Sequence, residues 1–324
     1  EIGQWCVYPD FNEIEKYSGY FMAKNFELFR DEAKRNGLLS QAADFLQASG
    51  KLQVLAYKHD IEAALRTPDF GGFQLLDLHD FPGQGTAPVG VLNTYWREKG
   101  YISPDEYRRF CNETVPLARI AKRTWTSHES FAARIQLSHF GATPLLQCTA
   151  TWKLAGPDHA IAHGQFPAVD VPTGGLTELG GIAVNLDQID TPTQVTLTVT
   201  IPGSPIANDW KLWIYPEQFT DKSPNNVLLS SSLDERTIAT LNSGGRVLLA
   251  PALDAINGRR EHWQPIFWNT QWIPGSNRSL GLLCEADHPA LALFPTDTHS
   301  DWQWHDLVNR SVAMNLQALP ATLP

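Results

Sequence analysis

One heptapeptide constrains the fold of this chain more than any other feature. Val195-Thr196-Leu197-Thr198-Val199-Thr200-Ile201 alternates an aliphatic side chain with a threonine. A period of two places the aliphatic side chains on one face of a β-strand and the threonines on the other. Shorter alternating runs lie at 131–138, 149–154 and 208–216, and turn-forming clusters separate the runs at 141–144, 156–158 and 202–203. The sequence therefore predicts a small antiparallel β-sandwich over residues 128–216.

The segment before this sandwich reads as helical. Between residues 13 and 65 apolar side chains recur at spacings of three and four, the pattern of helices packed on a core. Gly19, Gly37 and Gly50 are expected to divide the segment into shorter helices. Lys51 and Gln53 are expected on a solvated helix face. A second helix is predicted at Ser103-Pro104-Asp105-Glu106, which offers a serine cap, a proline at the first position and acids in the first turn.

A short apolar run, Phe73 to Leu78, lies between these helices and reads as one buried strand. Glycines precede it and Pro82 and Gly83 follow it, so it is too short for a helix. Asp77, His79 and Asp80 fall at its carboxyl end. In parallel α/β folds that end carries the chemistry, although a strand cap followed by a tight turn explains the same residues.

The chain opens with a second run of interest, Glu1-Ile2-Gly3-Gln4-Trp5-Cys6-Val7-Tyr8-Pro9. Together with Gly71-Gly72-Phe73 through Asp77, it resembles the last two strands of the catalytic barrel in glycoside hydrolase family 2, the β-galactosidase and β-glucuronidase-like enzymes. In that family the seventh strand ends in the nucleophilic Glu, often as Glu-x-Gly, and the eighth reads Gly-Gly-Phe-x-x-x-Asp. The usual tryptophan of the eighth strand is missing here, where Leu75 and Leu76 stand.

The resemblance implies three domains: the C-terminal part of a TIM-type α/β barrel at 1–127, an immunoglobulin-like β-sandwich at 128–216, and an α/β accessory domain at 217–324. It implies a retaining, exo-acting glycosidase that cleaves sugars derived from plant or microbial polysaccharides, with Glu1 as nucleophile. Its acid/base residue would belong to an Asn-Glu pair on a fourth strand that this sequence lacks, so the chain alone is expected to be inactive. Substrate contacts are expected from Gln4, Trp5, Tyr8, Asp77, His79, Asp80 and Gln84.

The last third of the chain predicts a βαβ unit. Val227 to Ser232 and Arg246 to Pro251 read as buried strands, and Asp234 to Leu241 reads as a helix between them. We expect the start of a flavodoxin-like or amidotransferase-like segment, and we expect the given sequence to cut this segment short at the C-terminus. Ser230 to Ser232 lack a Gly-x-Ser-x-Gly elbow, which favours helix capping over nucleophilic catalysis.

Neither a metal nor a cofactor is predicted. His299, Asp301 and His305 have side chains that bind metals, but their spacing fits no zinc pattern. Metal-assisted hydrolysis through Asp77, His79 and Asp80 would need a further ligand that the sequence does not reveal. The four cysteines lie far apart without a C-x-x-C pair and read as buried thiols.

Composition and charge exclude some classes of binding partner for this chain. A net charge of −10 argues against nucleic acid, which needs a basic surface, and no apolar run reaches membrane-spanning length. The chain starts without Met and without a signal pattern, so we expect missing upstream sequence and a periplasmic or extracellular protein. The expected partner is a carbohydrate substrate; the oligomeric state stays open. Eleven tryptophans also suit the competing class, a non-catalytic carbohydrate-binding or scaffold module.

Overall fold

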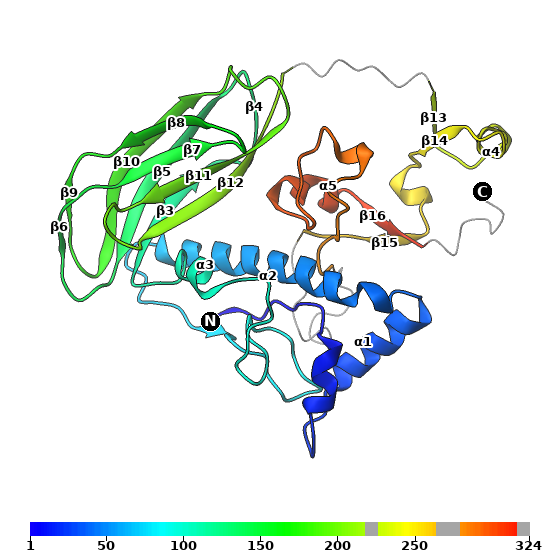
Figure 1. Ribbon diagram of the computed structural model, residues 1–324, viewed down its shortest axis with the longest axis horizontal. Coiled ribbons are helices and arrows are strands. Elements are labelled where there is room, and N and C mark those ends of the chain that lie inside the picture. The colour runs from blue at the N-terminus through cyan, green and yellow to red at the C-terminus, as the bar shows by residue number, and fades with distance from the viewer. Residues whose placement is uncertain (218–225, 264–278, 316–324) are drawn as a thin grey trace. The chain divides into compact units, whose positions relative to one another are not determined.

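The computed structural model describes residues 1–217, 226–263 and 279–315, and these fall into two compact units. The first unit contains residues 1–217 together with 279–303. The second contains 226–263 together with 304–315. Each unit has its own secondary structure, shown in Figure 1.

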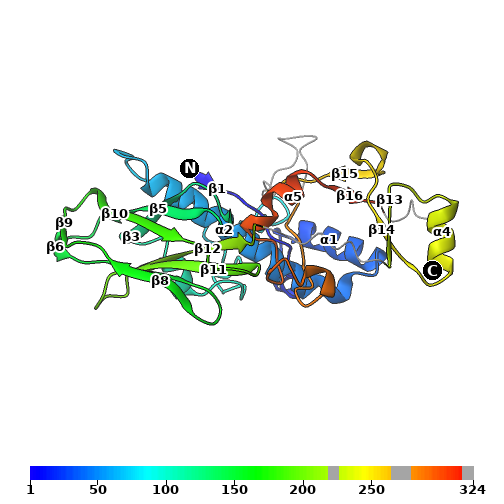
Figure 2. The ribbon, with the colours of Figure 1, turned by 90° about the horizontal axis from the view of Figure 1, so that it is seen from above.

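A β-sandwich dominates the first unit. Its three-stranded sheet has the order β10-β5-β3, formed by Gly175–Asn185, Ser130–His139 and Thr114–Ile120. Its five-stranded sheet has the order β4-β12-β11-β7-β8, formed by Thr124–Thr126, Ala207–Tyr215, Thr193–Thr200, Thr151–Ala155 and Ala160–Gln165. A further pair joins β6 (Leu145–Cys148) to β9 (Val169–Val171). The two larger sheets lie as layers in Figures 1 and 2.

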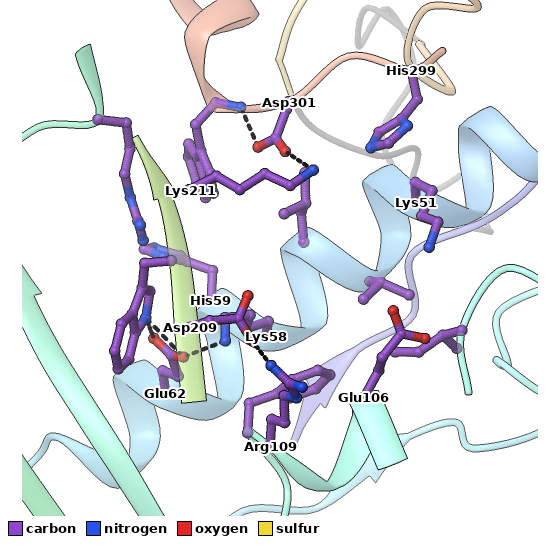
Figure 3. Close-up of a pocket in the computed structure, with 17 residues that line it drawn as sticks. Lys51, Lys58, His59, Glu62, Glu106, Arg109, Asp209, Lys211, His299 and Asp301 are labelled. Atoms are coloured by element: carbon purple, nitrogen blue, oxygen red, sulfur yellow. Dashed lines mark hydrogen bonds and ion pairs between the residues drawn. The ribbon is translucent and has the colours of Figure 1, made fainter. Parts of the chain in front are cut away.

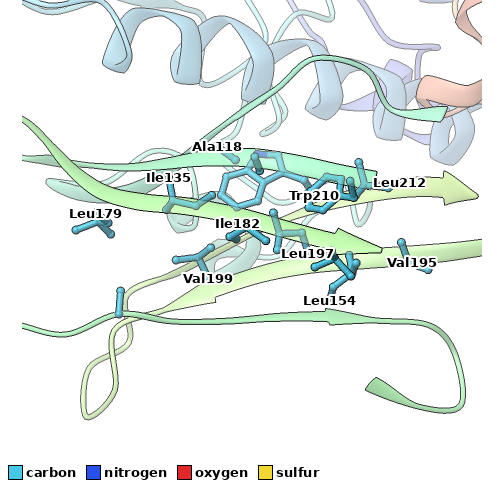
Figure 4. Packing of buried hydrophobic residues seen from close by; sticks show 14 of the residues in the cluster. Ala118, Ile135, Leu154, Leu179, Ile182, Val195, Leu197, Val199, Trp210 and Leu212 are labelled. Carbon is cyan, nitrogen blue, oxygen red and sulfur yellow. The ribbon is translucent and has the colours of Figure 1, made fainter. Parts of the chain in front are cut away.

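The aliphatic side chains of the alternating run lie in the core of this sandwich. Val195, Leu197 and Val199 on β11 have no exposed surface, whereas the threonines between them are half-buried. Figure 4 shows their side chains meeting those of the opposite sheet, among them Ile135 and Ile182. The predicted antiparallel strands are therefore confirmed, since β11 pairs antiparallel with both β7 and β12.

The helical part of the first unit contains α1 (Lys24–Arg35) and the longer α2 (Ala42–Leu65), preceded by a 3-10 turn at Phe11–Lys16. The expected break at Gly50 is wrong, because α2 runs through it. A Cβ at Gly50 would lie 2.2 Å from the ring of Tyr101, so this glycine serves close packing and not helix termination. The predicted capping box at Ser103 and Glu106 is confirmed, although the helix it begins, α3 (Pro104–Arg108), is short.

Two very short strands connect the opening motif to the glycine-flanked run. β1 (Ile2–Gly3) and β2 (Leu75–Leu76) pair in parallel, with Ile2 opposite Leu75 and Gly3 opposite Leu76. The predicted strand over 73–78 is thus present at only two residues. After Leu76 the chain forms isolated bridges with a nearby loop, from His79 to Leu92 and from Phe81 to Ala87.

The predicted TIM-type barrel is wrong for the described residues. Such a barrel needs eight parallel strands, each followed by a helix, whereas the parallel sheet of the helical part has two strands of two residues each. The first unit is mainly antiparallel β-structure, with the helices as a smaller part.

The second unit confirms the βαβ unit and corrects the fold drawn from it. β13 (Val227–Ser230) and β14 (Arg246–Leu249) pair in parallel around α4 (Glu235–Asn242), whose N-cap is Asp234. The next described strands, β15 (Gly258–Arg260) and β16 (Val312–Met314), form a separate antiparallel pair, and α5 spans His305–Asn309. A flavodoxin-like sheet needs a longer series of parallel strands, so that prediction is not supported.

Across the described ranges, the helices are all too short or too polar to traverse a lipid bilayer.

Candidate functional site

The parallel pairing of β1 and β2 brings the two predicted motifs side by side. The backbone N–H of Gln4 donates to the carbonyl of Leu76 at 2.5 Å. Gly3 has a φ of +102°, and a Cβ there would lie 2.8 Å from the same carbonyl, so only glycine fits this position of the Glu-x-Gly motif. Glu1 is exposed, and its carboxylate accepts a long hydrogen bond of 3.5 Å from the side chain of Gln4.

Asp77 and His79 come directly after β2 in the chain. Asp77 accepts a hydrogen bond from the backbone N–H of Leu78 at 2.7 Å. The His79 ring lies 4.4 Å from the indole of Trp96, which is 61% exposed, and its Nδ1 lies 2.8 Å from the carbonyl of Asp80. An exposed tryptophan beside an imidazole gives this part of the molecule a flat apolar face next to a polar group.

The other predicted contacts are placed less favourably for a ligand. Trp5 donates to Asp60 at 2.9 Å and packs on the helical core, and the Tyr8 ring packs edge-on against phenylalanines of the same unit. Asp80 is 2% exposed and forms a 2.6 Å ion pair with Lys99. Burial raises the pKa of Asp80, and the ammonium of Lys99 opposes that shift. Gln84 is exposed in a left-handed turn.

Gln53 makes buried hydrogen bonds that the sequence did not predict. Expected on a solvated face, it is fully buried. Its amide donates to the carbonyls of Trp5 at 2.6 Å and Val89 at 2.9 Å, and its oxygen accepts from the Tyr101 hydroxyl at 2.7 Å. Gln53 therefore fixes the segment after β1 to the loop after β2.

The first unit also contains a polar pocket of about 270 Å³ that sequence reasoning missed (Figure 3). Its walls come from α2, α3, β12 and the segment 299–302. This volume is just below the roughly 300 Å³ at which small-molecule sites begin. No single segment of the sequence carries the pattern, because the charged side chains that meet here are far apart in the chain.

Most charges of this pocket are already paired. Lys58 lies 3.1 Å from Glu62, and Arg109 lies 2.6 Å from Asp209. Glu62 is 2% exposed and also accepts hydrogen bonds from the Asn208 amide at 2.9 Å and the Trp210 indole at 3.1 Å. Burial alone would raise the pKa of Glu62, but Lys58 and these donors outweigh it and lower the pKa.

A group with metal-binding side chains lies at one end of the pocket. Asp297, His299 and Asp301 offer ligand atoms within 4.8 Å of one another. The ammonium of Lys211 lies among them, 2.6 Å from Asp297 and 3.3 Å from Asp301. Burial lowers the pKa of Lys211, but the two carboxylates raise it overall, so one cation already pairs with both acids. The arrangement favours an internal ion pair over a metal site.

The cysteines of the chain are free thiols. Burial, with a smaller contribution from Asp80, raises the pKa of Cys6 to about 12. Burial likewise raises the pKa values of Cys111, Cys148 and Cys284. A nucleophilic thiol needs a lowered pKa, so these cysteines are not candidates for catalysis.

Two segments match family models of uncharacterised domains. Residues 129–216 match a domain of unknown function (DUF8488), and residues 228–324 match another (DUF8487). A search of curated proteins returns no match.

Solved structures give distant matches. One is the CARDB domain of a Pyrococcus furiosus protein, at 5% identity and a TM-score of 0.24 over 32% of this chain and 94% of that one. Another is a β-glucosidase from Listeria innocua in complex with glucose, at 9% identity and a TM-score of 0.25 over 32% of this chain and 16% of that one. A third is a cycloisomaltooligosaccharide glucanotransferase from a Paenibacillus species, at 9% identity and a TM-score of 0.26 over 39% of this chain and 17% of that one.

Proposed function

We propose that this chain belongs to a retaining, exo-acting glycosidase similar to glycoside hydrolase family 2, with its sugar site at the edge formed by β1 and β2. One observation carries the proposal: Ile2 and Gly3 lie opposite Leu75 and Leu76 in a parallel pair. This register aligns the Glu-x-Gly motif with the Gly-Gly-Phe-x-x-x-Asp motif, although the 67 residues 4–70 separate them. The requirement for glycine at position 3 supports the same alignment.

In this proposal Glu1 attacks the anomeric carbon and forms a covalent glycosyl intermediate, which water then hydrolyses. A retaining pair of carboxyl groups stands about 5 to 5.5 Å apart. The Asp77 carboxylate follows β2 directly and already accepts a hydrogen bond from the backbone N–H of Leu78 at 2.7 Å. We therefore assign Asp77 to sugar hydroxyls and assign the acid/base role to no residue of the described chain.

The exposed face of Trp96 supplies the apolar part of the site. Flat aromatic faces suit the C–H side of a sugar ring, and an exposed tryptophan beside His79 offers such a face. The same feature favours the second candidate, a non-catalytic carbohydrate-binding module, in which Trp96 and Asp77 hold the sugar while Glu1 takes no part in bond cleavage.

Azide rescue separates the two candidates. In the protein as its source makes it, Glu1→Ala is expected to abolish turnover of an aryl glycoside, and added azide is expected to restore it and give a glycosyl azide of inverted configuration. Glu15→Ala is the matched control, because Glu15 is an exposed acid near the same end of the chain. Ordinary turnover by Glu1→Ala without azide would exclude Glu1 as the nucleophile. Sugar binding with no turnover in the unaltered protein would favour the binding module.

A further inference from the structure

The charged side chains of the polar pocket that form no ion pair or hydrogen bond within the described chain are cations. Within the described chain, the Lys51 ammonium and the Arg123 guanidinium form no ion pair or hydrogen bond, although both line the pocket. His299 is 8% exposed, and its ring has no hydrogen-bond partner among the described residues. Figure 3 shows His299 and Lys51 on the same side of the pocket.

The carboxylates around the same pocket each have a polar partner, although the Oδ2 atom of Asp301 is buried without a hydrogen bond. Glu62 and Asp209 have the cationic partners given above, and Asp297 and Asp301 share Lys211. Glu106 accepts hydrogen bonds from the backbone and hydroxyl of Ser103 at 2.8 and 2.9 Å. The charged side chains that the pocket leaves without a partner are therefore positive, which favours a ligand that brings negative charge.

Two flat surfaces complete the pocket. The Trp302 ring has the Arg123 guanidinium 5.9 Å from its centroid and the His59 ring 5.4 Å from it. The Phe110 ring lies under the Lys58 ammonium at 5.4 Å. Cations held over aromatic rings keep their charge in a partly buried site, which strengthens their attraction for an anion.

We propose that this pocket binds a monosaccharide-sized anion, whose carboxylate or sulfate contacts Lys51 and His299 within the positive field of Arg123. The volume of about 270 Å³ admits one such ligand and not an oligosaccharide. Charge-assisted hydrogen bonds from an ammonium and an imidazole to a carboxylate or sulfate are among the stronger polar contacts in proteins. This second site does not depend on Glu1 and is separate from the proposed sugar edge.

Isothermal titration calorimetry on the full chain tests the proposal with four probes: glucuronate, sulfate, glucose and a zinc salt. We expect glucuronate to bind and glucose, which has the same ring without the carboxylate, to give no measurable heat. Binding of sulfate as tight as that of glucuronate would assign the site to a free inorganic anion, and weaker sulfate binding would assign it to an acidic sugar. Zinc binding in the absence of anion binding would overturn the proposal, as would equal binding of glucose and glucuronate.

Charge-removing variants locate the site. Lys51→Gln and Arg123→Gln are each expected to raise the Kd for glucuronate about tenfold, since a hydrogen bond or close contact to a charged group is worth at least that factor. Neither side chain has a polar partner in the described chain, so both variants are expected to fold normally, with unchanged circular dichroism. Lys34→Gln is the matched control, an exposed lysine on α1 with no partner among the described residues. Unchanged binding in both pocket variants would refute the assignment.

Discussion

Replacing Glu62 by alanine is expected to destabilise the first unit strongly. Glu62 is 2% exposed and has four polar partners. Lys58 at 3.1 Å and Arg66 at 3.2 Å belong to α2 and its C-cap, and Asn208 at 2.9 Å and Trp210 at 3.1 Å join the helix to β12. Removing one member of a buried ion pair costs about 3 to 5 kcal/mol, because the remaining charge stays buried. An unsatisfied buried donor costs about 1 to 3 kcal/mol.

These costs do not add fully, because three of the partners keep other contacts, Arg66 among them through the carbonyl of Ala118 at 3.4 Å. The Lys58 ammonium still bonds the Asn208 side-chain oxygen and lies over two aromatic rings, and the Asn208 amide still donates to the carbonyl of Pro116 at 2.8 Å. We therefore expect a loss of about 4 kcal/mol in the free energy of unfolding. Glu62→Gln keeps an acceptor oxygen without the charge and is expected to lose about half as much.

Urea unfolding followed by tryptophan fluorescence measures this loss, because Trp210 bonds Glu62 directly and sits in the sandwich core. Glu15→Ala, at an exposed position, is expected to change the free energy by less than about 0.5 kcal/mol. A loss below about 1 kcal/mol in Glu62→Ala, with an unchanged slope against urea, would show that the network contributes little to stability.

The same residue predicts a dependence on pH. Its pKa in the folded chain lies below the reference value of 4.5, so below that value the unfolded chain binds more protons. Its stabilisation is complete above pH 4.5 and is lost as the pH falls through the lowered pKa. Between about pH 5 and pH 3 the unaltered chain should lose more stability than Glu62→Gln. Parallel curves for the two proteins would contradict the lowered pKa.

Three further predictions use single positions. Gly50→Ala is expected to cost about 1 to 3 kcal/mol in urea unfolding, because its Cβ would meet the Tyr101 ring, whereas Gly71→Ala, in open space, should be nearly neutral; equal effects would argue against the close approach. Ser103→Ala removes a capping box and should cost about 1 kcal/mol, and a neutral result would mean that α3 does not depend on its cap. Cys6 should resist a thiol reagent at pH 8 in the folded chain and react after unfolding, since its pKa is about 12; rapid reaction of the folded chain would contradict its burial.

The sandwich was predictable because its signal is local. Alternation alone assigns the aliphatic residues of Val195 to Ile201 to the buried face of a strand. In the structure, β11 places Val195, Leu197 and Val199 in the core. The cap at Ser103 was predictable for the same reason, since the residues that bond lie three positions apart. A pattern contained within one helix or strand depends only on residues that are near in sequence, so it can be recognised without the tertiary fold.

The barrel was wrongly predicted and the pocket was not predicted at all, for different reasons. An apolar run such as Phe73 to Leu78 indicates a buried strand without saying how many strands pair beside it, and β2 here pairs over two residues only. The pocket depends on side chains such as Lys51, Arg123 and His299, which come together only through the tertiary fold. A lysine on a helix reads as solvated unless its neighbours in space are known, and no sequence pattern supplies them.

Mechanism-based labelling tests the central claim, that Glu1 is the nucleophile of a retaining glycosidase, most directly. A 2-deoxy-2-fluoro glycoside with a good leaving group slows hydrolysis of the glycosyl intermediate, so the covalent adduct accumulates on the attacking carboxylate. Peptide mass spectrometry of the labelled protein, in the form its source makes, then locates the sugar. The account predicts one added sugar on the peptide that contains Glu1, and none in Glu1→Gln. An adduct on another carboxylate, or continued turnover with no adduct at all, would contradict it.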